Sequence, residues 1–340
     1  MCKRIFANQT TPEGEVPFYK IGTIGDKADA YISKKLFEEY KQRYNYPKCG
    51  EVMITCAGTV GKTILYNGQD AYYQDSNIVW ISNPRKIYSN EFLNYLLNRV
   101  DWSKLNSTTI TRIYNDNLRE LHITFPSREE QDKIVSLLTR IDDRIDTQIK
   151  IIEEQETLLK SLADKLFLQN NHSCQLSELV NIEKGKQLNA DTLSETGDYY
   201  VMNGGITPSG YYSEYNVPAG AISISEGGNS CGYVQFNEKP FWSGGHCYSL
   251  QCRTNLVDYK YIYYYLKTKE ADVMALRIGS GLPNIQKKDI EKFTISYPSL
   301  QLQKQFVKAL DALSGKINTE KNLLEKYCQQ KSYLLSQMFI

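Results

Sequence analysis

Two stretches of the chain place apolar residues at alternating spacings of four and three positions. The first stretch follows Pro126 and the second follows Pro298. Four-three spacing that continues over several heptads is typical of a coiled coil. We therefore predict two long helices, each roughly 55–60 Å long at the α-helical rise per residue. The predicted seam residues are Ile134, Leu138, Ile141, Ile145, Ile152 and Leu159 in the first stretch, and Phe306, Leu310, Leu313, Ile317 and Leu324 in the second.

Polar residues interrupt both seams. Gln148 and Gln155 break the first, and Glu320 and Lys331 interrupt the second. Two seams in one chain predict that the helices pack on each other as an antiparallel coiled coil. A parallel pair is the alternative, because a whole globular domain connects them. It is also possible that each helix only covers its own domain, but the strict spacing argues against this.

Outside these stretches the chain is rich in glycine and tyrosine, and in short alternating runs such as AISIS at 221–225. Such runs predict strands, and apolar segments such as NEFLNYLLNRV at 90–100 predict short helices. The expected fold class is α+β, with two mixed α/β domains alternating with the two long helices. The predicted boundaries are 1–125 for the first domain, 126–170 for the first helix, 171–297 for the second domain and 298–340 for the second helix.

The two halves of the chain repeat each other. The segment ITFPSREEQDKIV, which contains Pro126, matches ISYPSLQLQKQFV, which contains Pro298. Upstream, GEVMITCAGTVGKTILY from Gly50 resembles GAISISEGGNSCGYVQF from Gly220. The order of the predicted elements is the same in both halves, which indicates an internal duplication.

The segment CAGTVGKT at 56–63 is similar to a phosphate-binding loop, but it departs from that motif. The motif needs glycine where this chain has Cys56, and it must open a helix. The residues that follow, ILYNGQDAYY, predict a hairpin around Asn67-Gly68 instead. The matching segment SEGGNSCGY at 225–233 has no Gly-Lys-Thr. We interpret both segments as glycine turns between short strands, with glycines at positive φ.

Composition narrows the class of protein. The chain has 340 residues, a net charge of +1 and eight cysteines. A net charge so near zero excludes nucleic-acid binding by bulk charge, so any DNA contact requires local patches or a partner. No long apolar run and no signal-peptide core occur, and the cysteines form no CxxC pair, so we expect a cytoplasmic protein with reduced thiols. His246, Cys247 and Cys252 do not have zinc-site spacing, and no metal is expected.

No catalytic constellation is evident. The carboxylates of IDDRID at 141–146 fall beside seam positions on a predicted helix. His122 falls in a predicted strand and His172 in a linker, and neither has a nucleophile nearby. We therefore expect no enzymatic activity in this chain.

The duplicated motifs carry a resemblance to a known family. GEVMITCAGTVGKT, NGGITPSGYYSEYN at 203–216 and the two proline-serine helix starts, in this duplicated order, make the chain similar to the DNA-specificity subunit of a type I restriction–modification enzyme. The resemblance implies a non-catalytic subunit in which each domain reads one half of a split site in double-stranded DNA. It also implies that the helices set the gap and dock two methyltransferase subunits, with restriction subunits as possible further partners. The methyl donor S-adenosylmethionine would bind the methyltransferase, and this chain would hold no cofactor.

The first domain departs from the family pattern at its start. The second domain opens with CQLSELVNIEKGKQLNAD, whereas MCKRIFANQT corresponds only to the later part of that segment. By this comparison about a dozen residues of the family's usual start are absent from the first domain. Either Met1 is a late start or the first domain borrows a strand from elsewhere, and the stability of this domain is in question.

Small polar loops with one arginine precede the strand that leads to each long helix. Lysine and arginine suit phosphates, side chains with paired donors suit base edges, and loops are the usual carriers. The predicted DNA-contacting residues are Ser107, Thr108, Thr109, Arg112 and Tyr114 in the first loop, Arg277, Gly279, Ser280, Gly281, Asn284 and Lys287 in the second, and Arg4, Lys62, Lys186, Gln187 and Asn203 elsewhere.

The alternative function is a non-catalytic receptor- or carbohydrate-binding protein, with two repeated domains on a coiled-coil arm. Such a protein is expected to be a self-sufficient oligomer, whereas a specificity subunit is expected to need its methyltransferase for stability.

Overall fold

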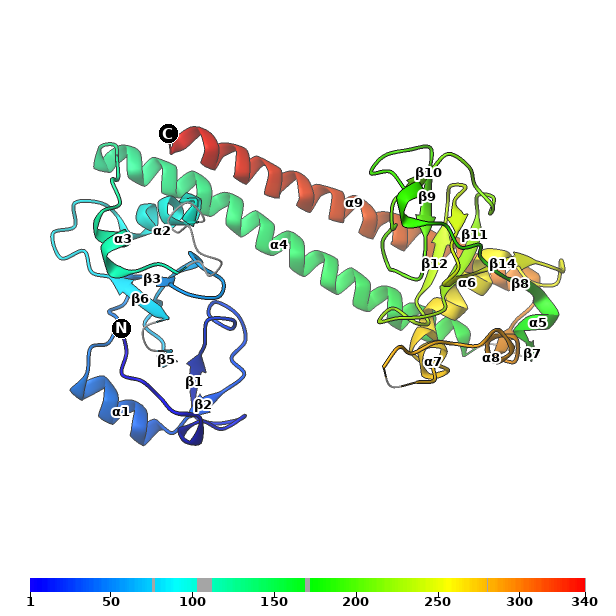
Figure 1. Ribbon diagram of the computed structural model, residues 1–340, viewed down its shortest axis with the longest axis horizontal. Coiled ribbons are helices and arrows are strands. Elements are labelled where there is room, and N and C mark those ends of the chain that lie inside the picture. The colour runs from blue at the N-terminus through cyan, green and yellow to red at the C-terminus, as the bar shows by residue number, and fades with distance from the viewer. Residues whose placement is uncertain (75–76, 103–111, 169–171, 280, 340) are drawn as a thin grey trace. The chain divides into compact units, whose positions relative to one another are not determined.

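The chain folds into two globular halves and two long helices (Figure 1). The computed structural model describes residues 1–74, 77–102, 112–168, 172–279 and 281–339. Its contacts group into two compact units, Met1–Thr147 with Leu324–Ile340, and Gln148–Leu323. Each unit therefore contains one globular half together with a segment of each long helix.

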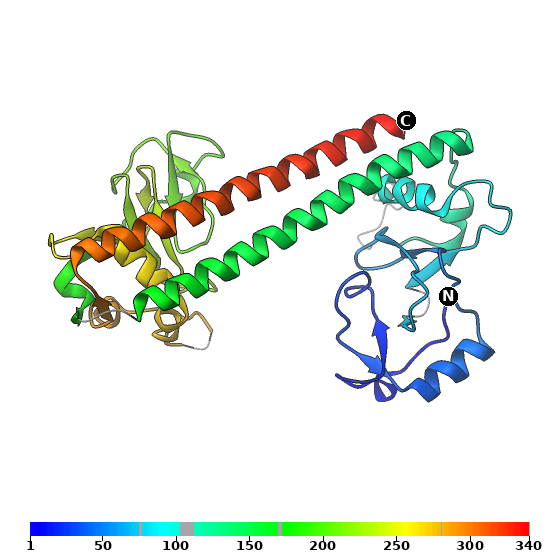
Figure 2. The ribbon, with the colours of Figure 1, turned by 180° about the vertical axis from the view of Figure 1, so that it is seen from behind.

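The long helices are α4 (Arg128–Phe167) and α9 (Leu300–Met338), and each is continuous (Figure 2). In the first unit, Lys331 Nζ lies 2.5 Å from Asp142 Oδ1. In the second unit, Gln148 Nε2 donates to the Glu320 carboxylate at 2.6 Å and to its carbonyl at 3.2 Å. The helices run antiparallel, because the earlier residue of α4 meets the later residue of α9. The predicted fold class is confirmed.

The seam residues lie on the sides of α4 and α9 that face the protein interior. In the first unit, Leu138 packs with Phe92 and Phe339. In the second, Leu159 packs against a core that includes Phe306. Of the seam residues, Leu138, Ile141, Ile152, Phe306, Leu310 and Ile317 are buried, and Ile134, Ile145, Leu159, Leu313 and Leu324 are half-buried.

The second half is built on a four-stranded antiparallel sheet of order β12-β11-β14-β8, which α6 covers. A three-stranded sheet has the order β10-β9-β13, and β15 pairs with β7. The elements are β7 (His172–Gln175), α5 (Leu176–Leu179), β8 (Val180–Lys184), β9 (Tyr199–Met202), β10 (Tyr211–Tyr212), β11 (Ala221–Ser225), β12 (Val234–Asn237), β13 (Trp242–Ser243), β14 (Cys247–Cys252), α6 (Tyr259–Thr268), α7 (Glu270–Ala275), α8 (Lys287–Glu291) and β15 (Thr294–Tyr297), with a short 3-10 turn at Ala190–Thr192.

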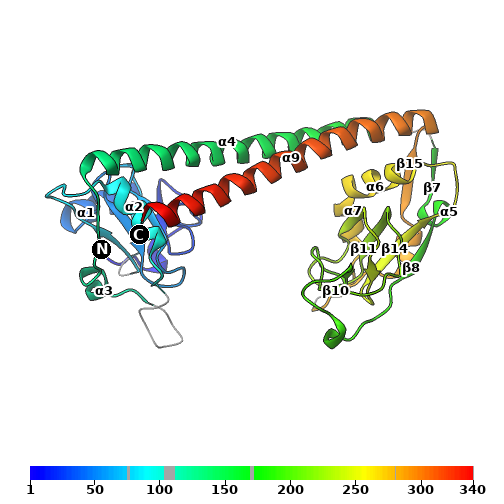
Figure 3. The ribbon, with the colours of Figure 1, turned by 90° about the horizontal axis from the view of Figure 1, so that it is seen from above.

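The first half repeats this plan with fewer strands. Its sheets have the orders β4-β3-β6 and β2-β1-β5, and β1 pairs with β5 in parallel as β9 does with β13. Helix α2 lies beside the start of α4 and the end of α9 (Figure 3). The elements are a 3-10 turn at Ala7–Gln9, β1 (Val16–Tyr19), β2 (Tyr31–Ile32), α1 (Lys34–Arg43), β3 (Val52–Thr55), β4 (Thr63–Leu65), β5 (Tyr72–Tyr73), β6 (Ile78–Ile81), α2 (Asn90–Arg99) and α3 (Asn115–Arg119).

The glycine segments are turns between paired strands. β3 pairs with β4, and β11 pairs with β12. Gly61 and Gly232 occupy these turns at φ of 86° and 90°, as predicted. A Cβ atom on Gly61 would collide with the Trp102 indole, and one on Gly232 would collide with Met274. Thr63 begins a strand rather than a helix, so the segment at 56–63 does not have the strand–loop–helix geometry of a phosphate-binding loop.

Two local predictions are wrong. No hairpin forms around Asn67-Gly68, because β4 pairs with β3 and β5 pairs with β1 in the other sheet. His122 does not lie in a strand, although the matching segment of the second half is β15. β15 is held by β7, and the described part of the first half has no segment paired with residues 121–125.

A buried glutamine fixes the start of each long helix. Gln131 and Gln303 are 1% and 0% exposed. Gln131 Oε1 accepts from Ser89 N at 2.8 Å, and Gln303 Oε1 accepts from Asp258 N at 2.7 Å. Each glutamine also donates to the carbonyl of the proline five residues earlier, at 2.9 and 2.8 Å. Because Ser89 and Asp258 cap α2 and α6, each glutamine ties a long helix to the short helix beneath it.

Candidate nucleic-acid interface

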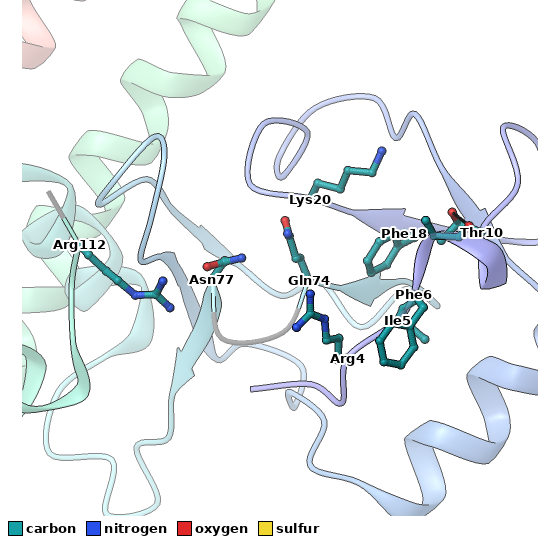
Figure 4. Close-up of a pocket in the computed structure, with 10 residues that line it drawn as sticks. Arg4, Ile5, Phe6, Thr10, Phe18, Lys20, Gln74, Asn77 and Arg112 are labelled. Atoms are coloured by element: carbon teal, nitrogen blue, oxygen red, sulfur yellow. Dashed lines mark hydrogen bonds between the residues drawn. The ribbon is translucent and has the colours of Figure 1, made fainter. Parts of the chain in front are cut away.

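The first half contains a polar hollow of about 430 Å³ (Figure 4). Arg4 reaches it from the N-terminal segment, Gln74 and Asn77 from between β5 and β6, and Arg112 from the segment before α3. Figure 4 shows these polar side chains gathered along the hollow, with apolar side chains at one end. The complete lining is Arg4, Ile5, Phe6, Ala7, Thr10, Phe18, Lys20, Gln74, Asn77 and Arg112.

Backbone hydrogen bonds hold these side chains in place. Gln74 N donates to Tyr19 O at 2.9 Å, and Gln74 Oε1 accepts from Ile21 N at 3.2 Å. Ile113 N donates to Cys56 O at 2.9 Å, which ties the segment that carries Arg112 to the end of β3. The hollow is therefore lined from two sheets and from two segments distant in the sequence.

Lys20 adds a third cation to the hollow, and it is partly compensated. Its Nζ lies 3.0 Å from Asp29 Oδ1, and the two side chains are 43% and 57% exposed. An ion pair with this exposure contributes at most about 1 kcal/mol, so Lys20 is readily available to an anionic ligand.

The second half has backbone hydrogen bonds equivalent to those that hold the lining segments of this hollow. We call this set of bonds the frame. Gly244 N donates to Met202 O at 2.8 Å, as Gln74 N does to Tyr19 O. Ile285 N donates to Glu226 O at 2.8 Å, as Ile113 N does to Cys56 O. These bonds make Gln74 equivalent to Gly244, Cys56 to Glu226 and Arg112 to Asn284.

The N-terminal segments also match. The antiparallel bridge between Thr11 and Tyr31 corresponds to that between Ser194 and Tyr211. Counting seven residues back from Thr11 and from Ser194 makes Arg4 equivalent to Gln187. Counting forward places Lys20 opposite Asn203.

Hydrogen bonds and close contacts link the segments of the second-half frame. Asn203 Oδ1 accepts from His246 N at 3.1 Å. The Gln187 side chain lies against Gly245, where a Cβ atom would have no room. Asn284 bridges to Gly227 and to Ile278.

A carboxylate sits inside this surface. Glu226 Oε1 lies 2.6 Å from Lys184 Nζ and accepts from Tyr248 Oη at 3.1 Å. Burial and then the Glu226 charge raise the pKa of Tyr248, so this hydroxyl stays protonated and donates. Glu226 Oε2 is buried without a hydrogen bond in the described part of the chain, and it lies 3.7 Å from His246 Nδ1.

The structure brings some of the predicted DNA-contacting residues together. Arg4 and Arg112 line one hollow, and Gln187, Asn203 and Asn284 belong to the matching surface. Lys186 precedes Gln187 and is exposed. Tyr114 is exposed, with its ring centroid 5.9 Å from Arg112 Cζ.

The remaining predicted residues lie elsewhere or are not described. Lys62 lines a separate hollow of about 1050 Å³ with Asp142 and Lys331 of the long helices, away from the residues that line the Arg4 hollow. Arg277, Gly279 and Gly281 are exposed after α7, and Lys287 lies 3.6 Å from Glu291 within α8. Ser107, Thr108, Thr109 and Ser280 lie outside the described residues.

Sequence reasoning missed several residues of both surfaces. Lys20, Gln74 and Asn77 were not among the predicted contacts, nor were Glu226 and His246. Lys20 could have been found as the equivalent of Asn203 if Tyr19 had been matched with Met202. That match is visible only once β1 and β9 are known to occupy equivalent places in their sheets.

The described residues contain neither a metal-binding cluster nor a helix that could span a membrane. Within 1–74, 77–102, 112–168, 172–279 and 281–339, no cluster of histidine, cysteine and carboxylate residues could hold a metal ion. Across the same ranges, no helix is long and apolar enough to cross a membrane. Burial raises the pKa of the Cys247 thiol to about 11, as expected for a packing residue.

Comparison with known proteins identifies relatives of this chain. A protein of Haemophilus influenzae named as a type I restriction enzyme specificity subunit is 49% identical over 42% of this chain and 37% of its own length. A protein of Mycoplasma genitalium named as a type I specificity subunit is 28% identical over 68% of this chain and 65% of its own length. The aligned parts thus span less than two thirds of each relative.

The fold has a solved counterpart. The crystal structure of the S subunit of a type I restriction–modification system from M. genitalium matches with a TM-score of 0.68 at 22% identity, over 100% of this chain and 92% of that one. The family described as "Type I restriction modification DNA specificity domain" matches residues 1–156 and again 170–326. Because these two matches cover most of the chain, the protein belongs to the type I restriction–modification DNA specificity family.

Proposed function

We propose that this chain is the DNA-specificity subunit of a type I restriction–modification system, in which each half reads one part of a split DNA sequence. The observation that carries the proposal is the repeated frame around the two polar surfaces. Equivalent backbone hydrogen bonds hold different side chains in the two halves, such as Arg112 in the first and Asn284 in the second. One scaffold used twice with different contact residues suits two half-sites of different sequence.

The side chains present suit DNA rather than a small apolar ligand. The first surface supplies Arg4, Lys20 and Arg112 as cations, and Gln74 and Asn77 as amides. Guanidinium and ammonium groups bind phosphates, and arginine and amide side chains also form paired hydrogen bonds with base edges in the major groove. The first half thus contains groups for both affinity and sequence discrimination.

The chain would need partners to act on DNA. Its described residues offer no catalytic constellation, so we propose a non-catalytic role. Two methyltransferase subunits would dock, one for each half, and hold S-adenosylmethionine, and restriction subunits would join the complete enzyme. The antiparallel helices α4 and α9 support this proposal, because they give each half the same kind of helical surface. They would also set the gap between the half-sites.

The alternative of a receptor- or carbohydrate-binding protein is not favoured. The family match spans both halves of the chain. No feature of the described residues points instead to a sugar ligand.

The test is co-expression of the chain with the methyltransferase of its system, followed by single-molecule mapping of methyladenine in host DNA. The proposal expects two short defined blocks around a fixed gap. Methylation without the chain, or an intact complex that methylates no defined sequence, would refute it. A single block would show that only one half reads DNA.

A further inference from the structure

The two matched surfaces differ in a consistent way at their exposed positions. Arg4 of the first half is equivalent to Gln187 of the second, and Arg112 is equivalent to Asn284. At both positions the first half carries a guanidinium where the second half carries a carboxamide. The two replacements occur in segments that are distant in sequence and adjacent in the fold.

In each half, both positions border one surface. Arg4 and Arg112 line the same hollow (Figure 4). In the second half, Gln187 lies against Gly245, and Asn284 bridges to Gly227. The two backbone segments that carry these contacts are joined by a hydrogen bond, because Glu226 N donates to His246 O at 2.9 Å.

The difference in charge lies in the pairs themselves, because the nearest charged neighbours are compensated in both halves, Lys20 by Asp29 and Glu226 by Lys184. The residues that line the first hollow include Lys20 and no acidic side chain. The second surface contains the Glu226 carboxylate, which is paired with Lys184 Nζ at 2.6 Å and is only 13% exposed. A surface rich in donors and cations favours base edges that carry only acceptors.

These two chemistries correspond to different base pairs. A guanidinium donates two parallel hydrogen bonds, which fit O6 and N7 of guanine. A carboxamide donates one bond and accepts one, which fits N7 and N6 of adenine. We propose that the first half reads its part of the DNA site at G·C pairs through Arg4 and Arg112, and that the second half reads its part at A·T pairs through Gln187 and Asn284. This inference rests on the proposed DNA-reading function.

The test is selection of bound sequences from a library of random double-stranded DNA, with the full chain in complex with its methyltransferase. Two double variants are compared with the unaltered chain, R4K/R112K and Q187A/N284A. The lysines of the first variant keep the positive charge and remove the guanidinium fork. Arg85→Lys is the matched control, because this exposed arginine follows the end of β6 opposite to Asn77.

We expect R4K/R112K to lose discrimination by about tenfold at one or two G·C positions of one block. Q187A/N284A is expected to lose it at A·T positions of the other block, and Arg85→Lys to leave both blocks unchanged. Loss at A·T positions in the first variant, at G·C positions in the second, or at no position in either would overturn this inference while leaving the split site established. Failure of the unaltered complex to enrich any sequence would overturn the proposed function instead, and this inference with it.

Discussion

At the scale of single residues, the glycine turn between β3 and β4 leaves no room for a side chain at Gly61. Gly61 combines a positive φ with the Trp102 indole directly where a Cβ atom would lie. We expect Gly61→Ala to destabilise the first half by about 2 kcal/mol or more, from left-handed strain and steric overlap. Hydrogen exchange of the β3 and β4 amides measures the effect. Gly22→Ala is the control, since nothing lies within 4 Å of its added Cβ, and equal protection in the two variants would contradict the argument.

The cysteines give a second prediction at this scale. Burial raises the pKa of the Cys2, Cys56 and Cys247 thiols to about 11. Only the thiolate is alkylated, so these groups stay protonated and unreactive at pH 8. The exposed cysteines, Cys49, Cys252 and Cys328, are expected to react first.

Mass spectrometry of peptides after brief treatment with iodoacetamide identifies the modified sites. The buried thiols should be modified only after denaturant is added. Rapid labelling of Cys247 in the folded chain would contradict the buried position of this side chain.

At the scale of elements, the glutamine at each helix start is expected to be required for local stability. Gln131→Ala leaves the buried Ser89 amide without its acceptor. A buried donor without a partner costs about 1–3 kcal/mol. We therefore expect faster hydrogen exchange at the start of α2 in this variant. Gln301→Ala, at an exposed position of α9, is the control and should change stability by less than about 0.5 kcal/mol.

Substitution of the two seam glutamines by leucine is expected to change the stability of the helix pair in opposite directions. Gln148 is buried and donates to Glu320, whereas Gln155 Oε1 is buried without a hydrogen bond in the described part of the chain. Gln155→Leu should stabilise the helix pair by about 1 kcal/mol, because it removes an unsatisfied group. Gln148→Leu should destabilise the pair. Denaturant unfolding followed by helical circular dichroism measures both, and a loss of stability in Gln155→Leu would contradict this account.

The long helices could be predicted from the sequence, but some of the strands could not. The long helices follow directly from four-three spacing, because the period of an α-helix determines which side chains share a face. A strand was predicted around His122, but the matching strand of the second half, β15, is held by its pairing with β7. A strand needs a partner, and the partner cannot be read from the strand's own residues.

The same distinction applies to the candidate site. Arg112 was predicted from loop composition and Arg4 as the counterpart of Lys186 and Gln187, and the structure places both arginines on one hollow. Gln74 and Asn77 were missed, because the parallel pairing of β1 with β5 brings that segment to the hollow. Non-local pairing of this kind leaves no trace in local composition. The sequence therefore predicted the fold class, while the membership of the site required the sheet topology.

At the scale of the whole molecule, net charge limits how the protein can hold DNA. Forty basic residues are balanced by 39 acidic ones, so this chain has no bulk excess of positive charge, and the phosphates that it neutralises must meet local groups of basic side chains. The logarithm of the affinity for duplex DNA falls with the logarithm of salt concentration, with a slope of about −0.9 per phosphate neutralised. We expect a shallow slope for the chain alone and a clearly steeper one once the methyltransferase subunits are bound.

Fluorescence anisotropy of a labelled duplex that contains the mapped site, titrated at several salt concentrations, gives both slopes. The double substitution Arg4→Ala with Arg112→Ala should reduce the slope by at most about two units if these residues also contact phosphates. Arg85→Ala is the control for the loss of one exposed charge. Equal slopes with and without the methyltransferase would mean that this nearly neutral chain supplies all the phosphate contacts. In that case the partner's role would be confined to catalysis.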